Sequence, residues 1–266
     1  MEIKKVLVLV DFSSTGQLAL DQAIEFAQRK KAKVALGHVL TSGEEEQETK
    51  HKLEQLAESI DSAGLESDII LERGDFLDEI QHVVKRHKAD LVVVGTHGKV
   101  GLRQNLFGSN IYNLVKSLPA PSLVVSDDFK RVQGGFKKIL LPIAPHENFI
   151  KKVTLSAELL APEGRLVLFS IVKPGLEFSD RLEKNMKETS QFLDDHDISW
   201  ENVEAESQHF SIGFSRETIQ YAADNGIDAI SIMAKVSDEN KSFGTMDKES
   251  IILNKKGLAV LCYNEG

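Results

Sequence analysis

Five short segments of this chain occur twice, in the same order, once in each half of its 266 residues. The pairs are residues 4–10 with 137–143, 33–39 with 165–171, 89–94 with 227–232, 107–109 with 243–245, and 120–125 with 257–261. Their spacing is close to constant, and a repeat of this length indicates two copies of one fold. We therefore expect one domain at residues 1–127 and a second at residues 136–266, joined by a solvated linker around Asp127–Gly135.

Most of the repeated segments are continuous apolar runs, which are typical of strands buried in a parallel sheet. Between these runs, apolar residues recur at the three-and-four spacing of amphipathic helices. In the first half the helical positions are Leu18, Ala19, Ala23, Ile24 and Ala27; Leu53, Leu56, Ala57 and Ile60; Phe76, Ile80, Val83 and Val84; and Ile111, Leu114 and Val115. Strands that alternate with helices predict an α/β fold with two tandem doubly wound parallel five-stranded sheets.

The composition argues against several classes of function. A hydrophobic fraction of 41% is ordinary for a globular protein, and a formal net charge of -9 argues against a nucleic-acid-binding surface. No apolar stretch approaches the roughly 20 residues of a membrane span, and the N-terminus lacks the features of a signal peptide. We therefore expect a cytoplasmic protein with no membrane partner. Cys262 is the only cysteine, which excludes an intramolecular disulfide and a cysteine metal cluster, and the histidines lack metal-ligand spacing.

A glycine-rich segment follows the fourth predicted strand of the first half. It reads Gly95-Thr96-His97-Gly98 and, after nine further residues, Gly108-Ser109-Asn110. Glycines let the backbone approach a ligand closely, and the free N–H groups at the start of the next helix suit phosphate. Lys99 and Arg103 lie between the glycines and add positive charge. The spacing matches neither the dinucleotide motif nor the Mg-ATPase phosphate loop, and a tight turn followed by a helix cap is the alternative interpretation.

This spacing resembles the ATP-binding signature of the universal stress protein family, and the resemblance extends over both halves. It includes the first strand followed by Asp11-Phe12-Ser13, and the final strand of the first half at residues 120–125. The resemblance implies a Rossmann-like fold similar to that of the adenine nucleotide alpha hydrolases. It also implies ATP as the ligand, with magnesium as an accompanying ion left open.

The resemblance further implies roles for individual residues. Asp11 would lie near the adenine and ribose, and the backbone of Val39 would read the adenine edge. The phosphates would be held by Gly95, Gly98, Gly108 and Ser109. The remaining candidates, which would line the cleft or add charge beside it, are Ser13, His97, Arg103 and Asn110.

The second half departs from this pattern. In register, the residues that replace Asp11, Gly95 and Gly98 are Ala144, Ala234 and, approximately, Ser237. Each added Cβ blocks close approach, and Asp238 and Glu239 would repel phosphate. We therefore expect a single nucleotide site, in the first half, and a degenerate copy in the second.

Three functions are compatible with these patterns. The leading interpretation is an ATP-binding regulatory protein of the stress response that is not an enzyme, and its stress role comes from the resemblance alone. A slow ATPase or nucleotide-transforming enzyme is the first alternative, although no nucleophile carries a surrounding motif and Asp11 has no evident partner as a general base. A nucleotide-free interaction module is the second, although the first-half motif is intact.

The resemblance also implies that the two halves pair. Domains of that family pair antiparallel through their final strand, and a linker makes such pairing intramolecular. We therefore expect a pseudo-dimer in which residues 123–125 run against 258–261, with higher homo-oligomers left open.

Two further features have structural interpretations. Glu44-Glu45-Glu46 is typical of the acidic first turn of a helix, where it complements the helix dipole. Trp200 begins a predicted strand, and we expect it to pack rather than to stack on a base.

Overall fold

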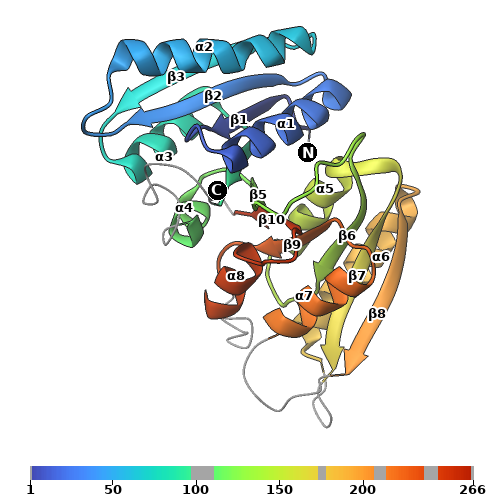
Figure 1. The fold of residues 1–266 in the computed structure, drawn as a ribbon. Helices are drawn as coiled ribbons and strands as arrows, with labels where there is room; N and C mark the ends of the chain where they lie inside the picture. Colours follow the sequence, from blue (N-terminus) through green and yellow to red (C-terminus); the bar gives the residue numbers. More distant parts are fainter. Residues whose placement is uncertain (1, 97–110, 173–177, 207–213, 237–244, 265–266) are drawn as a thin grey trace. The chain divides into compact units, whose positions relative to one another are not determined.

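A computed structural model describes residues 2–96, 111–172, 178–206, 214–236 and 245–264 of the chain. The chain divides into two compact units, Glu2–Gly134 together with Asn264–Gly266, and Gly135–Tyr263. Figure 1 follows the chain through both units in sequence order.

The first unit is a parallel five-stranded sheet with two helices on each face. Its elements are β1 (Lys5–Leu9), α1 (Ser14–Lys30), β2 (Lys33–Leu40), α2 (Glu46–Ser62), β3 (Ser67–Arg73), α3 (Phe76–His87), β4 (Leu91–Gly95), α4 (Ile111–Ser117) and β5 (Ser122–Val125). The strand order is β3-β2-β1-β4-β5, and all neighbouring pairs are parallel. Right-handed crossovers place α1 and α2 on one face and α3 and α4 on the other. The sheet is therefore doubly wound, as predicted.

The second unit repeats this plan. Its elements are β6 (Phe136–Pro142), α5 (Phe149–Leu159), β7 (Leu160–Val172), α6 (Asp180–Asp195), β8 (Ser199–Glu206), α7 (Ser215–Asp224), β9 (Ala229–Met233), α8 (Thr245–Ile252) and β10 (Ala259–Tyr263). The strand order is β10-β9-β6-β7-β8, again parallel throughout. The central strands β4 and β9 are fully buried, which explains why they read as continuous apolar runs.

One side-chain contact occurs at the same place in both units. The Oδ2 atom of Asp90 accepts hydrogen bonds from the backbone N–H groups of residues 4 and 5, both at 2.9 Å. In the second unit, Oδ2 of Asp228 accepts from the N–H groups of residues 137 and 138, at 2.6 and 3.0 Å. Each aspartate thus accepts hydrogen bonds from the backbone N–H groups at the start of its unit's first strand. This contact explains why Asp90 and Asp228 occupy the same position in the two copies of the repeat.

The segment that joins the units is largely exposed to solvent, as expected, but it is also anchored to the first unit. The side-chain amide of Gln22, fully buried in α1, donates to the carbonyl of Val132 at 3.2 Å and accepts from its N–H at 2.8 Å. The Phe129 side chain is buried, and Arg131 lies 3.7 Å from Glu25 of the same helix. Composition alone could not indicate these contacts because the anchoring residue, Gln22, lies far away in the sequence.

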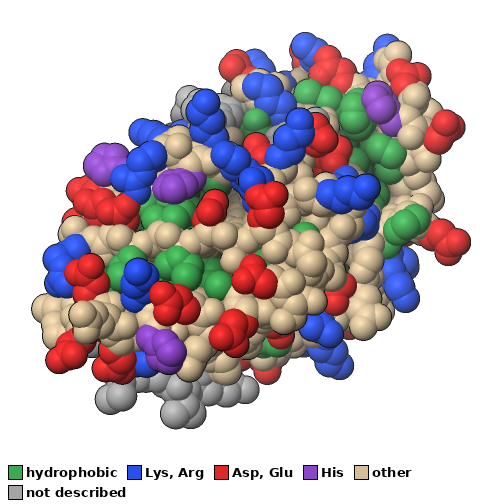
Figure 2. All heavy atoms as spheres, turned by 90° about the horizontal axis from the view of Figure 1, so that it is seen from above, with side chains coloured by type: hydrophobic (Ala, Val, Ile, Leu, Met, Phe, Trp, Pro, Cys, Tyr) green, Lys and Arg blue, Asp and Glu red, His purple; other side chains and the backbone are tan. Residues whose placement is uncertain are grey.

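Acidic and basic side chains are intermixed on the face of the molecule that Figure 2 shows, with small apolar areas between them. No described helix is long and apolar enough to cross a membrane. Trp200 lies in β8, where it is half-buried, and its Nε1 donates to Oδ1 of Asp194 at 2.8 Å.

Candidate functional site

The candidate site of the first unit lies at the carboxyl ends of three adjacent strands. Successive strands run outward from β1 through β2 to β3, and then from β4 to β5 on the opposite side, so the strand order reverses between β1 and β4. Ligands of open α/β sheets bind in the crevice at this switch point. Asp11 follows β1, Val39 lies near the end of β2, and Gly95 ends β4. The structure therefore brings these three predicted residues to one edge.

Asp11 is held in place by the start of α1. Its Oδ1 accepts from the N–H of Ser13 at 3.0 Å and from the Ser13 hydroxyl at 2.6 Å. Ser13 is the N-cap of α1, and its Oγ accepts from the N–H of Gly16 at 3.0 Å. Both hydrogen bonds to Asp11 use Oδ1, so Oδ2 has no hydrogen-bond partner among the described residues. Ser13 thus orients the carboxylate, and Oδ2 remains able to accept from a ligand hydroxyl.

Two glycines allow this close packing. A Cβ atom on Gly16 would lie 2.5 Å from Oδ1 of Asp11, and a Cβ on Gly95 would lie 2.9 Å from the backbone carbon and oxygen of Thr15. Real Cβ atoms do not approach other atoms so closely. Gly95 therefore has a role beyond the ligand: it lets the first turn of α1 rest on the end of β4. The sequence motif did not predict Gly16 or this contact.

No described backbone group pairs with Val39 on the side where the crevice lies. The ladder between β1 and β2 ends at the pair Leu9–Gly37, and the N–H of Val10 donates to the carbonyl of Gly37 at 2.9 Å. Backbone groups of successive strand residues point to opposite sides, so Val39 presents its N–H and C=O toward β1, which has already ended. These groups have the donor and acceptor character that reads the edge of a purine.

The other predicted site residues lie outside the described part of the chain. They are His97, Gly98, Arg103, Gly108, Ser109 and Asn110.

Sequence analysis missed a cluster beside Val39. The carbonyl of Val10 lies 2.7 Å from Nδ1 of His38, which is buried, and Oε2 of Glu44 lies 3.3 Å from Nε2. The same Glu44 oxygen accepts from the N–H and the hydroxyl of Thr41, at 2.6 and 2.9 Å. Glu44 therefore closes the loop after β2 and is not part of the first turn of α2, which begins at Glu46. Our interpretation of Glu44 was wrong because a local charge pattern cannot reveal a contact that depends on the loop's path.

A second missed contact lies on the other side of the crevice. Asp127, just after β5, accepts a hydrogen bond from the hydroxyl of Thr15 in α1. Phe12 also lies at this edge, in a left-handed backbone conformation (φ 57°), with its ring 5.0 Å from that of His38. A non-glycine residue at positive φ is uncommon and often marks a functional position.

The strand register of the second unit corrects one equivalence. Val6 pairs with Leu91 in the first unit, and its counterpart Ile139 pairs with Ala229, so Gly95 corresponds to Met233 rather than to Ala234. Backbone hydrogen bonds support this equivalence. The N–H of Thr96 donates to the carbonyl of Val125 in β5, and the N–H of Ala234 donates to the carbonyl of Tyr263 in β10. The first helix also begins later here, at Phe149, which stands where Gly16 does, so the close contact that requires Gly95 does not form. Ala144 takes the place of Asp11, as predicted.

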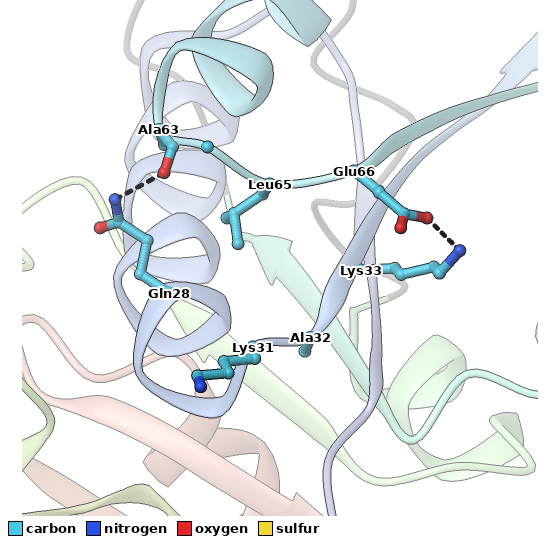
Figure 3. A pocket seen from close by; sticks show the side chains of 8 residues that line it. Gln28, Lys31, Ala32, Lys33, Ala63, Leu65 and Glu66 are labelled. Atoms are coloured by element: carbon cyan, nitrogen blue, oxygen red, sulfur yellow. Dashed lines mark hydrogen bonds and ion pairs between the residues drawn. The ribbon is translucent and has the colours of Figure 1, made fainter.

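A surface cavity of about 510 Å³ lies at the opposite, amino-terminal edge of the first sheet (Figure 3). The C-terminal ends of α1 and α2 meet there, and Gln28 of α1 donates to the carbonyl of Ala63 at 3.0 Å. Its charged residues include Lys31 and the ion pair between Lys33 and Glu66. Helix C-termini disfavour anions, so this cavity does not suit a nucleotide phosphate.

Comparisons with known proteins identify the family of the first half. Residues 2–126 match the model of the universal stress protein family. Residues 2–126 therefore form a domain of the universal stress protein family. Universal stress protein MJ0577 of Methanocaldococcus jannaschii is 28% identical over 152 residues, which is 46% of this chain and 94% of that protein. Universal stress protein YxiE of Bacillus subtilis is 26% identical over 144 residues, 46% of this chain and 97% of that protein.

Two solved structures resemble the chain over its length. A universal stress protein from Archaeoglobus fulgidus DSM 4304 has a TM-score of 0.73 at 13% identity, covering 100% of this chain and 97% of that one. The functionally unknown protein PA1789 from Pseudomonas aeruginosa PAO1 has a TM-score of 0.65 at 16% identity, and the match covers 98% of this chain and 92% of that one. At such identities the likeness concerns the fold, and it includes the second half, which the family model does not match.

Proposed function

We propose that the first half of this universal stress protein binds ATP and that the chain acts as a regulatory protein of the stress response rather than as an enzyme. The observation that carries the proposal is the assembly of Asp11, Val39 and Gly95 at adjacent strand ends of the half that matches the family. The glycine-rich signature follows directly after β4, at the same edge.

In this proposal each residue has a separate role. Oδ2 of Asp11 accepts a hydrogen bond from the ribose, while Ser13 keeps the carboxylate in position. The N–H and C=O of Val39 recognise the adenine edge. The residues of the signature, Gly98, Gly108 and Ser109, hold the phosphates, because glycines allow close approach and a helix start offers free N–H groups. Among the described residues no cluster of three His, Cys, Asp or Glu side chains could hold a metal.

Calorimetry with ATP should give one nucleotide per chain. Gly98→Val should abolish this binding, because the added side chain blocks the phosphate face. Ser237→Val, in the segment that follows β9 of the second half, should leave affinity and stoichiometry unchanged. Chromatography of the denatured, purified protein would show independently whether an adenine nucleotide is carried along.

Two results would contradict the proposal. Two ATP molecules per chain would mean that the second half also binds ATP. Normal binding by Gly98→Val would show that the signature does not form the phosphate site.

Hydrolysis of ATP should be absent or far slower than the roughly 1–100 per second of kinases. Fast phosphoryl transfer needs charge clamps and a positioned nucleophile. At the described part of the edge the nearest carboxylates are already engaged, Asp11 by Ser13 and Asp127 by Thr15. Steady release of phosphate at kinase-like rates, measured with the full chain, would favour the enzyme instead.

We further propose that the second half is retained as the structural partner of the first. The expected antiparallel pairing of residues 123–125 with 258–261 would make it so, and this pairing stays a prediction.

A further inference from the structure

The pairing of β1 with β2 stops one hydrogen bond before the backbone that we assign to adenine. In this parallel ladder the N–H of Lys33 donates to the carbonyl of Lys4 at 2.9 Å, and every second residue of β2 faces β1 in the same register. At that register the next bond of the series would run from the N–H of Val39 to the carbonyl of Val10. No such bond is present in the described part of the chain, so the ladder leaves both groups to other partners.

A buried side chain binds the carbonyl that the ladder leaves over. Nδ1 of His38 lies 2.7 Å from the carbonyl oxygen of Val10, and because a carbonyl can only accept, Nδ1 carries the hydrogen and donates it. Nε2 lies 3.3 Å from Oε2 of Glu44, and the ring lies 5.0 Å from that of Phe12. The imidazole is thus fixed on both sides, and it supplies the donor that a longer ladder would take from Val39.

The equivalent position of the second unit lacks this contact. Its ladder also ends where the N–H of Ile143 donates to the carbonyl of Phe169, at 2.8 Å. Ser170 stands where His38 does in the repeat, and its buried hydroxyl has no hydrogen-bond partner among the described residues. The histidine is therefore present in the half that keeps the ATP motif and absent from the half that has lost it.

Other side chains hold the end of the first strand in the second unit. Asn185 of α6 donates to the carbonyl of Ala144 at 2.7 Å, and Lys152 of α5 donates to that of Pro142 at 2.9 Å. The segment after β6 is therefore held from the helices that cover the sheet. In the first unit the corresponding donor comes from His38, the strand residue next to Val39.

We propose that His38 is a positioning residue of the ATP site, which keeps the N–H of Val39 available to adenine by donating to the carbonyl of Val10. This inference rests on the ATP site proposed above. Adenine presents an acceptor at N1 and a donor at its amino group, which match the N–H and C=O of Val39, whereas guanine presents a donor at N1 and an acceptor at O6. The same hydrogen bond fixes the peptide group that leads into Asp11, so one imidazole positions the contacts to the base and to the ribose.

The first measurement needs no ATP. His38→Leu removes the donor at similar volume, so the N–H of Val39 should pair with the free carbonyl of Val10, because a buried carbonyl without a partner is unfavourable. In the deuterated full chain labelled with ¹³C and ¹⁵N, a scalar coupling across this hydrogen bond should be absent from the wild type and present in His38→Leu. It should be absent again in His38→Asn, whose side-chain amide can donate in place of Nδ1.

The second measurement is nucleotide affinity by calorimetry. His38→Leu should bind ATP roughly three- to tenfold more weakly, as expected for one hydrogen bond, and its preference for ATP over GTP should fall by a similar factor. His38→Asn should restore most of both. His82→Leu, at an exposed histidine of α3, should change neither. Circular dichroism checks that each variant folds.

The outcomes separate this inference from the proposed function. A wild-type chain that does not bind ATP contradicts the proposed function itself. A wild-type chain that binds ATP, together with a His38→Leu variant that binds it equally well or shows no new coupling, overturns the role of His38. Equal losses in His38→Asn and His38→Leu would overturn it as well, because the volume of the ring rather than its donor would then be what matters.

Discussion

The second unit should lose about 2–3 kcal/mol of unfolding free energy when the pH falls from about 6.5 to about 4.5. The cause is His146, which follows β6 at the carboxyl edge. Burial, followed by the charges of Lys248 and Lys152, lowers the pKa of His146 from 6.5 to about 3. Between these two pH values the unfolded chain binds a proton at this residue and the folded chain does not. Stability therefore rises with pH through this window and falls as the solution is acidified.

Denaturant titrations at the two pH values would measure this loss. Trp200 is the only tryptophan, so its fluorescence reports on the second unit. His146→Gln should remove most of the dependence on pH, and His196→Gln, at an exposed histidine of the same unit, should leave it intact. An unchanged slope in His146→Gln would show that another group is responsible.

Replacing Gly135 by alanine should destabilise the second unit by about 3 kcal/mol or more. Gly135 has a φ of 109°, which side chains rarely allow, and an added Cβ would lie 2.7 Å from the backbone nitrogen of Ala161 and 2.9 Å from the carbonyl carbon of Leu160. Backbone atoms at the start of β7 cannot move aside without disturbing the pairing of β6 with β7. The same fluorescence titration would measure the effect.

The adjacent glycine is a matched control. Gly134 also has a positive φ, of 68°, but a Cβ there would meet nothing within 4 Å. Gly134→Ala should therefore cost only about 1–2 kcal/mol, from backbone strain alone. Equal effects of the two substitutions would mean that the contact with β7 is not important for stability.

The fold could be predicted from the sequence because its signals are local and occur twice. Strands such as β4 and β9 are buried on both faces, so they are apolar without interruption, and the helices between them are amphipathic. The repetition of this order in two halves left few alternatives. The repeat of residues 89–94 at 227–232 already places Met233 opposite Gly95, and the assignment of Ala234 was wrong because it departed from that alignment by one residue.

The candidate site was predicted less completely. Asp11 and Val39 could be named from the family resemblance, and Gly95 from the glycine spacing after the fourth predicted strand. Their assembly in the structure follows because the ends of parallel strands meet at one edge of a sheet. The contacts of Thr15 with Asp127 and of Glu44 with His38 join different elements, and no spacing along the chain indicates them.

The burial of Lys152 and Lys248 could not be predicted, for a different reason. Lysines at helical spacing indicate a solvent-exposed face, and nothing in the sequence distinguishes buried Lys152 from exposed Lys151. Only the structure shows that the second half gained polar contacts where it lost the ATP motif.

The anchoring of Val132 by Gln22 decides where the chain can be divided. A fragment that stops at residue 127 would leave the amide of Gln22, fully buried in the intact chain, without its backbone partner and would remove Phe129 from the core. A fragment that continues to Gly134 keeps both. Transplanting the first half into another protein therefore requires the connecting segment to be kept with it, because that segment completes the packing of the half although the family model ends before it.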